Sequence, residues 1–431
     1  MILTLKLQRG MNMILEFSCS NHKSILNKVT FSSLATSDTT FEEKIKETDE
    51  LRVLKAAVIY GANGSGKSNF LDAISFVKNL VVNSVNYQPG QGIRQMPHKL
   101  CGFSKESSYQ IQFITEGIRY AYGFSLSNML VSEEYLYYFP NGRQAKIFDR
   151  ENEAFTVGSK FRGKFNTCRD VLKPNRLLLS CAANFTTVEE VEAVYNFFNN
   201  DLVIYSPVNQ DNWMNYSLYQ INANSKVKRA VLSFMRNLGI DIKDIRVNID
   251  EKKLEESEVP PFLSDEFKHM LLQRKIDAIT AKVVYGKFET DLLMEESTGI
   301  QKLFAILCPL IDIMINGKVL ICDELEAGLH ESLVYELVKL FVNTQLDSFA
   351  QIIFSTHETG LLNLDLFRRD QIWFTEMEGA ERYTDLYSLA EIKNVRKQDN
   401  FGKGYITGKY GAIPMLNINF ASIVSEIQRG E

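Results

Sequence analysis

The glycine-rich segment Gly61–Ser68, with the sequence GANGSGKS, constrains the fold of this chain more than any other feature. It fits the pattern G-x-x-x-x-G-K-[ST], in which glycines let backbone N–H groups close around phosphate oxygens. An apolar run at residues 54–60 is typical of a buried strand, and residues 68–78 repeat apolar residues at helical spacing. The order of strand, loop and helix predicts a nucleoside triphosphate site; a glycine-rich turn that binds nothing is the alternative.

The residue types in this loop suggest individual roles. Lys67 would reach the β- and γ-phosphates of ATP, and Ser68 would bind Mg²⁺. The N-terminus of the following helix adds a dipole that favours negative charge. The residues expected to contact the nucleotide are Gly61, Asn63, Gly64, Gly66, Lys67 and Ser68.

A second motif begins more than two hundred residues later, where the apolar strand at residues 317–322 ends in Asp323 and Glu324. It resembles a Walker B strand. Asp323 would bind Mg²⁺ directly or through water, and Glu324 would polarise the water that attacks the γ-phosphate. Taken alone, the pair could also be two solvated carboxylates at a strand end.

A polar turn with the sequence EESTGIQK, residues 295–302, opens an apolar helix shortly before that strand. Serine and glycine at a helix start are typical of an N-cap and can also contact a phosphate. The residues predicted to make this contact are Ser297, Gly299 and Gln301. An ordinary helix cap is the alternative explanation.

The fourth motif is a β-rich apolar run, residues 351–356, that ends at His357. From the end of a strand beside Asp323, this histidine could hydrogen-bond the γ-phosphate or the attacking water. A structural histidine is the alternative. The order of the four motifs along the chain favours a functional role for each.

Together the motifs resemble those of ABC-type ATPases, in which a Ser-x-Gly-x-Gln helix of one protomer touches the γ-phosphate held by the other. The greatest similarity is to the soluble SMC- and RecF-like branch that includes the RloA/AbiLi-type abortive-infection ATPases; the PARIS-type ATPase subunit is also similar. Two departures are His22, where the family usually has an aromatic residue, and Lys23, where arginine is common. Residues 13–24, 118–124, 133–136, 323–330, 368–374 and 404–414 carry the resemblance outside the loop.

The resemblance implies binding and hydrolysis of ATP with Mg²⁺ at the interface of a homodimer or higher homo-oligomer. Lys67, Ser68 and Asp323 of one protomer would face Ser297 and Gly299 of another. It further implies a sensor or regulatory subunit in anti-phage defence that controls a separate nuclease or toxin effector. The alternatives are a RecF- or SMC-like genome-maintenance ATPase that acts directly on DNA and, less favoured, the ATPase subunit of a transporter.

Composition limits the partners. With a formal net charge of −5, the molecule as a whole does not attract DNA, so DNA binding would need a local basic surface. Candidate segments are residues 160–165, 226–229 and 393–397. The six cysteines lack metal-ligand spacing, and no apolar run reaches the roughly twenty residues that span a bilayer. We therefore expect a cytoplasmic protein with reduced thiols and no membrane contact.

The predicted fold class is α/β, an ABC-type (SMC/RecF-like) P-loop ATPase head with an inserted, mainly helical subdomain. Three regions are expected. Residues 1–125 would form one ATPase lobe with the phosphate loop, and residues 126–285 the helical insertion, since segments such as 188–198 have helical periodicity. Residues 286–431 would form a second lobe with the other three motifs.

Overall fold

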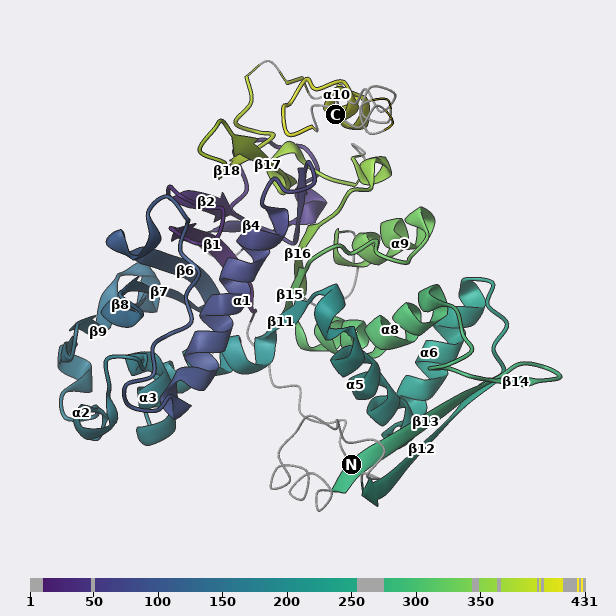
Figure 1. Ribbon diagram of the computed structural model, residues 1–431, viewed down its shortest axis with the longest axis horizontal. Helices are drawn as coiled ribbons and strands as arrows, with labels where there is room; N and C mark the ends of the chain where they lie inside the picture. The colour runs from purple at the N-terminus through teal and green to yellow at the C-terminus, as the bar shows by residue number, and fades with distance from the viewer. Residues whose placement is uncertain are drawn as a thin grey trace. The chain divides into compact units, whose positions relative to one another are not determined.

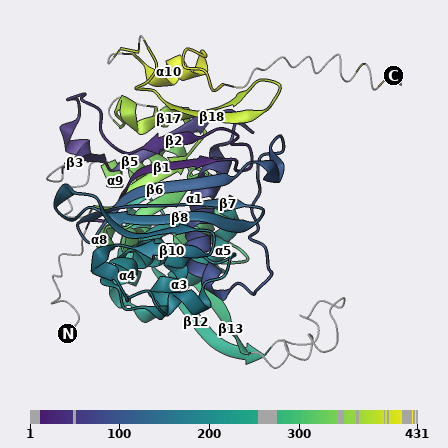
Figure 2. The ribbon, with the colours of Figure 1, turned by 90° about the vertical axis from the view of Figure 1, so that its left-hand side faces the viewer.

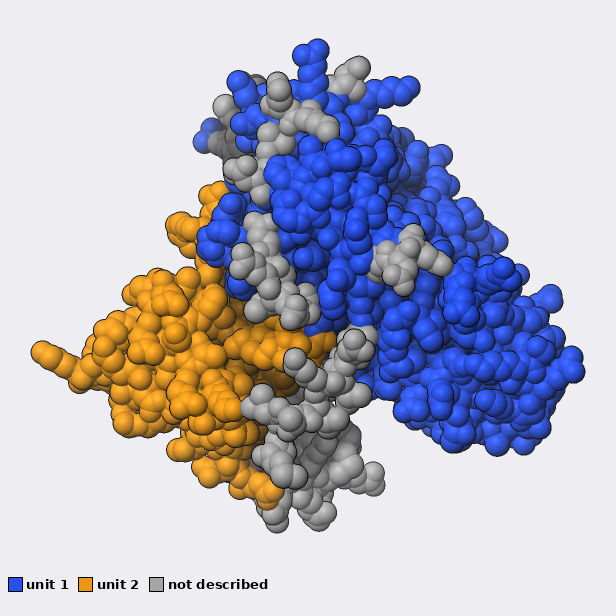
Figure 3. Space-filling view, turned by 180° about the vertical axis from the view of Figure 1, so that it is seen from behind, with its two compact units in different colours: residues 1–204, 317–325, 335–431 blue, residues 205–316, 326–334 orange. Residues whose placement is uncertain are grey.

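A computed structural model describes residues 11–47, 51–253, 275–342, 349–362, 366–393, 395–396, 399–413, 425 and 428. The chain divides into two compact units, coloured separately in Figure 3. Unit 1 comprises residues 1–204, 317–325 and 335–431, and unit 2 comprises residues 205–316 and 326–334. Two segments named above are only partly described. Residue 414 of the segment 404–414 that carries the family resemblance lies outside the described residues, and so do residues 394 and 397 of the basic segment 393–397.

Unit 1 contains a seven-stranded antiparallel sheet in the order β10-β9-β8-β7-β6-β1-β2. Figure 2 shows this sheet facing the viewer with α1 behind it. In most of these strands buried and more exposed side chains alternate, as the pleat of a half-buried strand requires. The bounds are β1 Met13–Ser20, β2 Val29–Ser32, β6 Ser107–Thr115, β7 Ile118–Ser127, β8 Leu130–Tyr138, β9 Ala145–Glu151 and β10 Ala154–Val157.

A six-stranded sheet, in the order β11-β15-β16-β5-β17-β18, carries the nucleotide motifs. Strands β15, β16, β5 and β17 run parallel, and β18 pairs antiparallel with β17. Its parallel strands are buried on both faces, which explains their continuous apolar runs. The bounds are β5 Ala56–Gly61, β11 Leu202–Tyr205, β15 Val319–Cys322, β16 Gln351–Ser355, β17 Ile372–Glu378 and β18 Tyr383–Ser388.

The core of unit 1 lies between these sheets, with helix α1 (Lys67–Asn83) between them in Figure 1. Phe70, Ile74 and Val77 of α1 are buried in one cluster with side chains of both sheets. Other described helices and strands of unit 1 are β3 Ile45–Glu47, β4 Arg52–Leu54, α2 Cys168–Val171, α3 Leu178–Phe185, α4 Glu189–Asn196 and α10 Phe401–Ile406; α9, Glu331–Val342, spans a unit boundary. The six cysteines, all within the described residues, form no disulfide.

Among its described residues, unit 2 contains α5, α6, α8 and the three-stranded sheet β12-β13-β14. Helix α8 is apolar around most of its circumference and packs against α5. Pro309 inside α8 has no N–H to donate to the carbonyl of Ala305, and Ser217 Oγ of α5 donates to that carbonyl at 2.8 Å instead. The bounds are α5 Gln210–Ala223, α6 Ser225–Asn237, β12 Asp244–Lys253, β13 Lys275–Val284, β14 Glu289–Asp291 and α8 Thr298–Asn316.

Helix α8 is also the one described helix that is long and apolar enough to cross a membrane by length and composition. Most of its apolar window is buried inside the protein. Burial in a core accounts for such a composition without any membrane.

The α/β class is confirmed, whereas the compact units differ from the three regions expected from the sequence. Residues 130–157 of the expected helical insertion form β8, β9 and β10, which extend the antiparallel sheet of unit 1. The helix that follows Ser297 groups with α5 in unit 2, although the sequence placed it with residues 286–431. Long-range strand pairing and helix packing, which local periodicity does not reveal, set these boundaries.

A fully buried ion pair fixes α3 on this sheet. Arg150 Nη1 of β9 lies 3.2 Å from Glu134 Oε2 of β8, and neither side chain is exposed. The carboxylate also accepts backbone N–H bonds from Leu178 and Leu179 at the start of α3, at 2.6 and 2.9 Å. Burial raises the pKa of Glu134 above its ordinary value, against the opposing effect of Arg150. The pair therefore stabilises the fold only while both partners are present.

We expect Glu134→Gln to lower the free energy of unfolding by about 3 kcal/mol, because it leaves the Arg150 charge buried without its counter-ion. Urea unfolding followed by circular dichroism measures the change. Glu133→Gln is the matched control, since Glu133 is exposed on the same strand and directly opposite Glu151. Equal unfolding free energies for the two variants would contradict this role of Glu134.

Candidate functional site

The glycine loop joins β5 to α1 as the sequence predicts. Every residue of β5 is buried, and α1 begins at Lys67 after Gly66, whose φ of 109° is in the left-handed region that glycine tolerates. Lys67 is itself buried, and its Nζ donates to the carbonyls of Gly61 and Ala62 at 2.8 and 3.2 Å. The amine therefore lies across the inside of the loop, at the N-terminus of α1.

Two threonines from β17 and β18 hold the loop in place. Ser65 Oγ lies 2.6 Å from Thr375 Oγ1, and Thr384 Oγ1 donates to the carbonyl of Ser65 at 2.9 Å. A Cβ added to Gly66 would lie 2.0 Å from Thr384 Oγ1, and one added to Gly61 would lie 2.5 Å from the Thr375 carbonyl oxygen. These glycines are therefore required by packing as well as by backbone conformation.

The two acidic residues follow β15, and the neighbouring strand β16 orients them. Ser355 Oγ, at the end of β16, donates to Asp323 Oδ1 at 2.6 Å and accepts from the N–H of Glu324 at 2.9 Å. Glu324 has a φ of 51°, a left-handed conformation that costs a non-glycine residue about 1–2 kcal/mol. The Ser355 contacts hold Glu324 in this conformation, with its side chain exposed.

Residues from three of the four motifs line one cavity of about 380 Å³. The phosphate loop and the start of α1 supply one wall, and the residues that follow β15 and β16 supply the other. This juxtaposition is expected because the carboxyl ends of parallel strands meet at one edge of a sheet. The lining residues are Asn63, Gly64, Gly66, Lys67, Ser68, Asn69, Glu324 and His357.

The polar turn at residues 295–302 belongs to unit 2 and leads into α8. The N–H of Ile300 donates to Ser297 Oγ at 3.4 Å, as expected of a helix cap. Gly299 packs closely, since a Cβ there would lie 3.1 Å from a carbonyl oxygen of unit 2. Gln301 Nε2 donates to the carbonyls of Leu293 and Glu296, each at 3.1 Å. The amide of Gln301 therefore orders its own turn, and its contact with a nucleotide stays a prediction.

The segment after β1 lies beside α1. His22, at 1% exposure, takes the place of an aromatic residue: its ring lies 5.8 Å from the ring of Phe76 and 5.7 Å from that of Tyr109. His22 Nε2 and Lys23 Nζ approach Asp72 Oδ2 of α1 at 3.0 and 2.6 Å. Burial alone would raise the pKa of Asp72, but the hydrogen bonds from His22 and Lys23 outweigh it and lower this pKa. Lys23 thus pairs with α1 and does not line the cavity.

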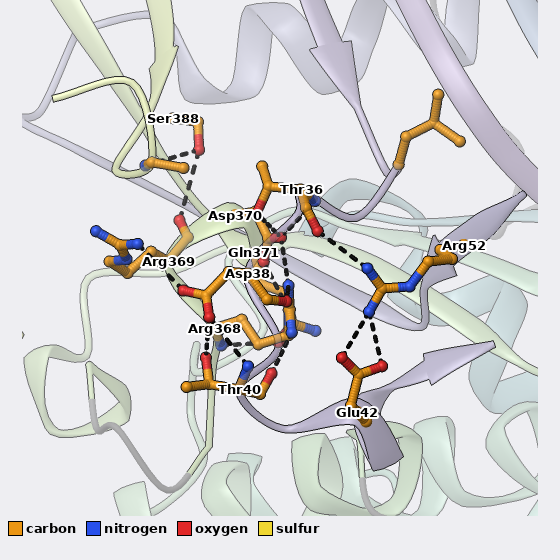
Figure 4. A network of polar contacts seen from close by, with 12 residues as sticks. Thr36, Asp38, Thr40, Glu42, Arg52, Arg368, Arg369, Asp370, Gln371 and Ser388 are labelled. Carbon is orange, nitrogen blue, oxygen red and sulfur yellow. Dashed lines mark hydrogen bonds and ion pairs between the residues drawn. The ribbon is translucent and has the colours of Figure 1, made fainter. Parts of the chain in front are cut away.

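A buried polar network supports β5, the strand that leads into the loop (Figure 4). Arg368 Nε and Nη2 bind the two carboxylate oxygens of Asp370 at 2.9 and 2.8 Å, and Asp370 also accepts from Thr36. Gln371 Nε2 donates to the carbonyl of Ala56, the first residue of β5, at 2.8 Å. Residues 368–374, one of the segments that carry the family resemblance, therefore support the site structurally.

Several residues of the site were not predicted from the sequence. Asn69 lines the cavity and donates to Ser24 Oγ at 2.7 Å, while Ser24 also contacts Thr384. Ser355 lies two residues before His357, so its position in that motif was an available signal. No sequence signal marked Thr375 and Thr384, because only the pairing of β17 with β5 and β18 brings them to the loop.

Comparison with known proteins gives one family match. The family described as "AAA domain, putative AbiEii toxin, Type IV TA system" matches residues 56–363, more than half of the chain. This range includes all four motifs. A search of curated proteins found no match.

Similar solved structures include two SMC heads and a RecF protein. An SMC head bound to the C-winged helix domain of ScpA is 16% identical, with a TM-score of 0.44, covering 87% of this chain and 97% of that chain. The SMC head domain from Thermotoga maritima is 14% identical, with a TM-score of 0.40, covering 87% and 98%. The recombination mediator protein RecF with ATP is 13% identical, with a TM-score of 0.32, covering 88% and 100%.

We expect Gly66→Ala to reduce nucleotide affinity roughly tenfold or more, because the added Cβ overlaps Thr384 and strain of about 1–3 kcal/mol displaces the loop. Titration with a fluorescent ATP analogue measures the affinity. Gly90→Ala is the control: its φ of 81° is also left-handed, but a Cβ there has nothing within 4 Å. If both variants bind nucleotide like the parent protein, close packing does not position the loop.

Proposed function

This chain belongs to the AAA-domain family whose model matches residues 56–363, and on that basis we propose that it binds and hydrolyses ATP. One observation carries the proposal. A single cavity is lined by Lys67 and Ser68 from the phosphate loop and by Glu324 and His357 from two neighbouring strand ends. It thus combines a cation and helix N-terminus for phosphates with a carboxylate and an imidazole suited to activate water.

Each residue contributes a distinct part of the chemistry. Lys67 would bind the β- and γ-phosphates and stabilise the charge that develops on them. Glu324 would accept a proton from the attacking water, and the strained backbone held by Ser355 keeps its carboxylate at the cavity. His357 would hydrogen-bond the γ-phosphate or the attacking water.

The oxygen donors here suit Mg²⁺, which prefers carboxylates, hydroxyls and water. The Ser68 hydroxyl lines the cavity, and Asp323 is oriented by Ser355 and immediately precedes Glu324. Ser68 and Asp323 would hold the ion. When bound, Mg²⁺ supplies charge neutralisation and orientation of the phosphates.

The site would be completed by a second copy of the chain. Ser297 and Gly299 at the start of α8 would approach the γ-phosphate held by the partner protomer, where the helix N-terminus adds donors and a favourable dipole. ATP binding would then close a homodimer or higher homo-oligomer, and hydrolysis would open it.

For the biological role we propose a regulatory ATPase of the RloA/AbiLi type in anti-phage defence, acting in the cytoplasm on a separate nuclease or toxin effector. The description of the matching family, which links the AAA domain to a type IV toxin–antitoxin system, supports this role. Direct action on DNA is the alternative. Against it, Lys160 and Lys228, in two of the basic segments, are each paired with a carboxylate.

We expect Glu324→Gln to lower the ATPase rate about 10²-fold or more, by removal of the general base, while ATP stays bound. Lys67→Ala should weaken nucleotide binding itself, because it removes the cation from the loop.

Phosphate release and binding of a fluorescent ATP analogue separate the two effects. Glu331→Gln, an exposed glutamate at the start of α9, is the control. Parent-like turnover by Glu324→Gln would show that another group activates the water.

The ATPase rate of the purified chain with and without linear duplex DNA distinguishes the two roles. We expect no change on addition of DNA, since the basic segments are short and partly paired. Strong stimulation that falls with added salt would favour direct action on DNA. A DNA-independent rate directs the search to an effector retained by the ATP-bound Glu324→Gln protein.

A further inference from the structure

Two short segments, one in each unit, expose large apolar side chains and are hydrogen-bonded to residues of the proposed composite site. Scattered exposed apolar residues are ordinary, whereas several within a short loop mark a contact surface. The unit 1 rim consists of Met96, Leu100 and Phe103, and the unit 2 rim consists of Phe288, Leu293 and Met294.

The unit 1 rim has a fixed backbone. The buried side chain of Asn21 donates to the carbonyls of Gly102 and Lys105 at 3.2 and 2.7 Å and accepts from the N–H of His98 at 2.9 Å. The N–H groups of Cys101 and Gly102 donate to the His98 carbonyl, which forms a tight turn. The apolar side chains therefore project from an ordered loop, and their exposure needs an explanation.

The unit 1 rim is connected to the nucleotide cavity. The N–H of Lys23 donates to the carbonyl of Met96 at 2.6 Å, and Lys23 Nζ pairs with Asp72 of α1. The next residue, Ser24, accepts a hydrogen bond from Asn69, which lines the cavity. The backbone of the rim is therefore joined to the cavity through two short hydrogen-bonded segments.

The unit 2 rim is connected in the same way to the start of α8. Asp291 Oδ1 accepts from the N–H groups of Leu293 and Met294 at 2.9 and 3.0 Å, which turns both side chains outward. Gln301 donates to the carbonyl of Leu293, so the rim and the turn that contains Ser297 form one hydrogen-bonded structure. Leu293 and Met294 therefore move together with the turn that contains Ser297.

We propose that the unit 1 rim of one copy packs against the unit 2 rim of a second copy when the two close over nucleotide. This inference rests on the proposed function, because Ser297 reaches the partner's cavity only in such a pair. The second copy is the partner that fits: both rims are apolar, and each is hydrogen-bonded to a segment that the composite site brings together. Phosphate contacts would make closure depend on ATP, and the rims would supply apolar burial that makes the closed dimer persist.

The dimer dissociation constant of the Glu324→Gln protein with ATP, measured by analytical ultracentrifugation, tests this contact. Leu100→Glu and Met294→Lys should each raise it roughly tenfold or more, because each buries a charge in an apolar contact. Ile406→Glu and Val208→Lys are matched controls, with exposures of 64% and 95% against 59% for Leu100 and 86% for Met294. The controls should leave the constant unchanged, and nucleotide affinity at dilutions that keep the protein monomeric should not change in any variant.

Mixing the two rim variants tests which surfaces meet. In a mixed dimer one interface pairs Glu at 100 with Lys at 294 and the other keeps the native residues, so the mixture should dimerise close to the parent strength. The inference would be wrong if each variant alone dimerised like the parent, or if the mixture did not regain the dissociation constant of the parent. Either result would not affect the proposal that the chain is an ATPase. If the Glu324→Gln parent stays monomeric with ATP, both the composite site and the rim contact are wrong.

Discussion

The close approach of the phosphate loop to the threonines of β17 and β18 is the contact on which the site depends. The loop and these threonines are about three hundred residues apart in sequence, and Gly66 fits against Thr384 only because it has no Cβ. Lys67, the next residue, donates to the carbonyl of Gly61 within the same loop. Gln371, just before β17, donates to the first residue of β5, and Ser65 of the loop contacts Thr375 of β17, so the site depends on the pairing of these two strands.

The local parts of the site could be predicted from the sequence. Strand, loop and helix around Gly61–Ser68 follow one another directly, so glycine placement and apolar periodicity were enough to recognise them. The strands before Asp323 and His357 were equally clear, because buried parallel strands are continuous apolar runs. Their placement at one cavity followed from the rule that parallel strands end at the same edge.

The parts that depend on distant contacts could not be predicted. Nothing in the sequence around Thr384 marks it as a support of the loop, because its role comes from the order of strands in the sheet. The strand character of residues 130–157 was overlooked beside the stronger helical periodicity further along the chain. The hydrogen bonds of the Gln301 amide to backbone carbonyls of the preceding turn are local, yet sequence spacing does not reveal them, and its nucleotide contact stays a prediction.

Helix α8 has a further consequence for how this chain can vary. Pro309 removes the N–H that would have bonded to Ala305, and a hydroxyl from α5 takes its place. Substitutions at positions 217 and 309 are therefore expected to depend on each other: a mutation that restores an N–H at 309 frees position 217 from the need for a donor. Loss of Ser217 first would leave a buried carbonyl unsatisfied. A change at 309 before a change at 217 therefore leaves α8 intact, whereas the reverse order would pass through a destabilised protein.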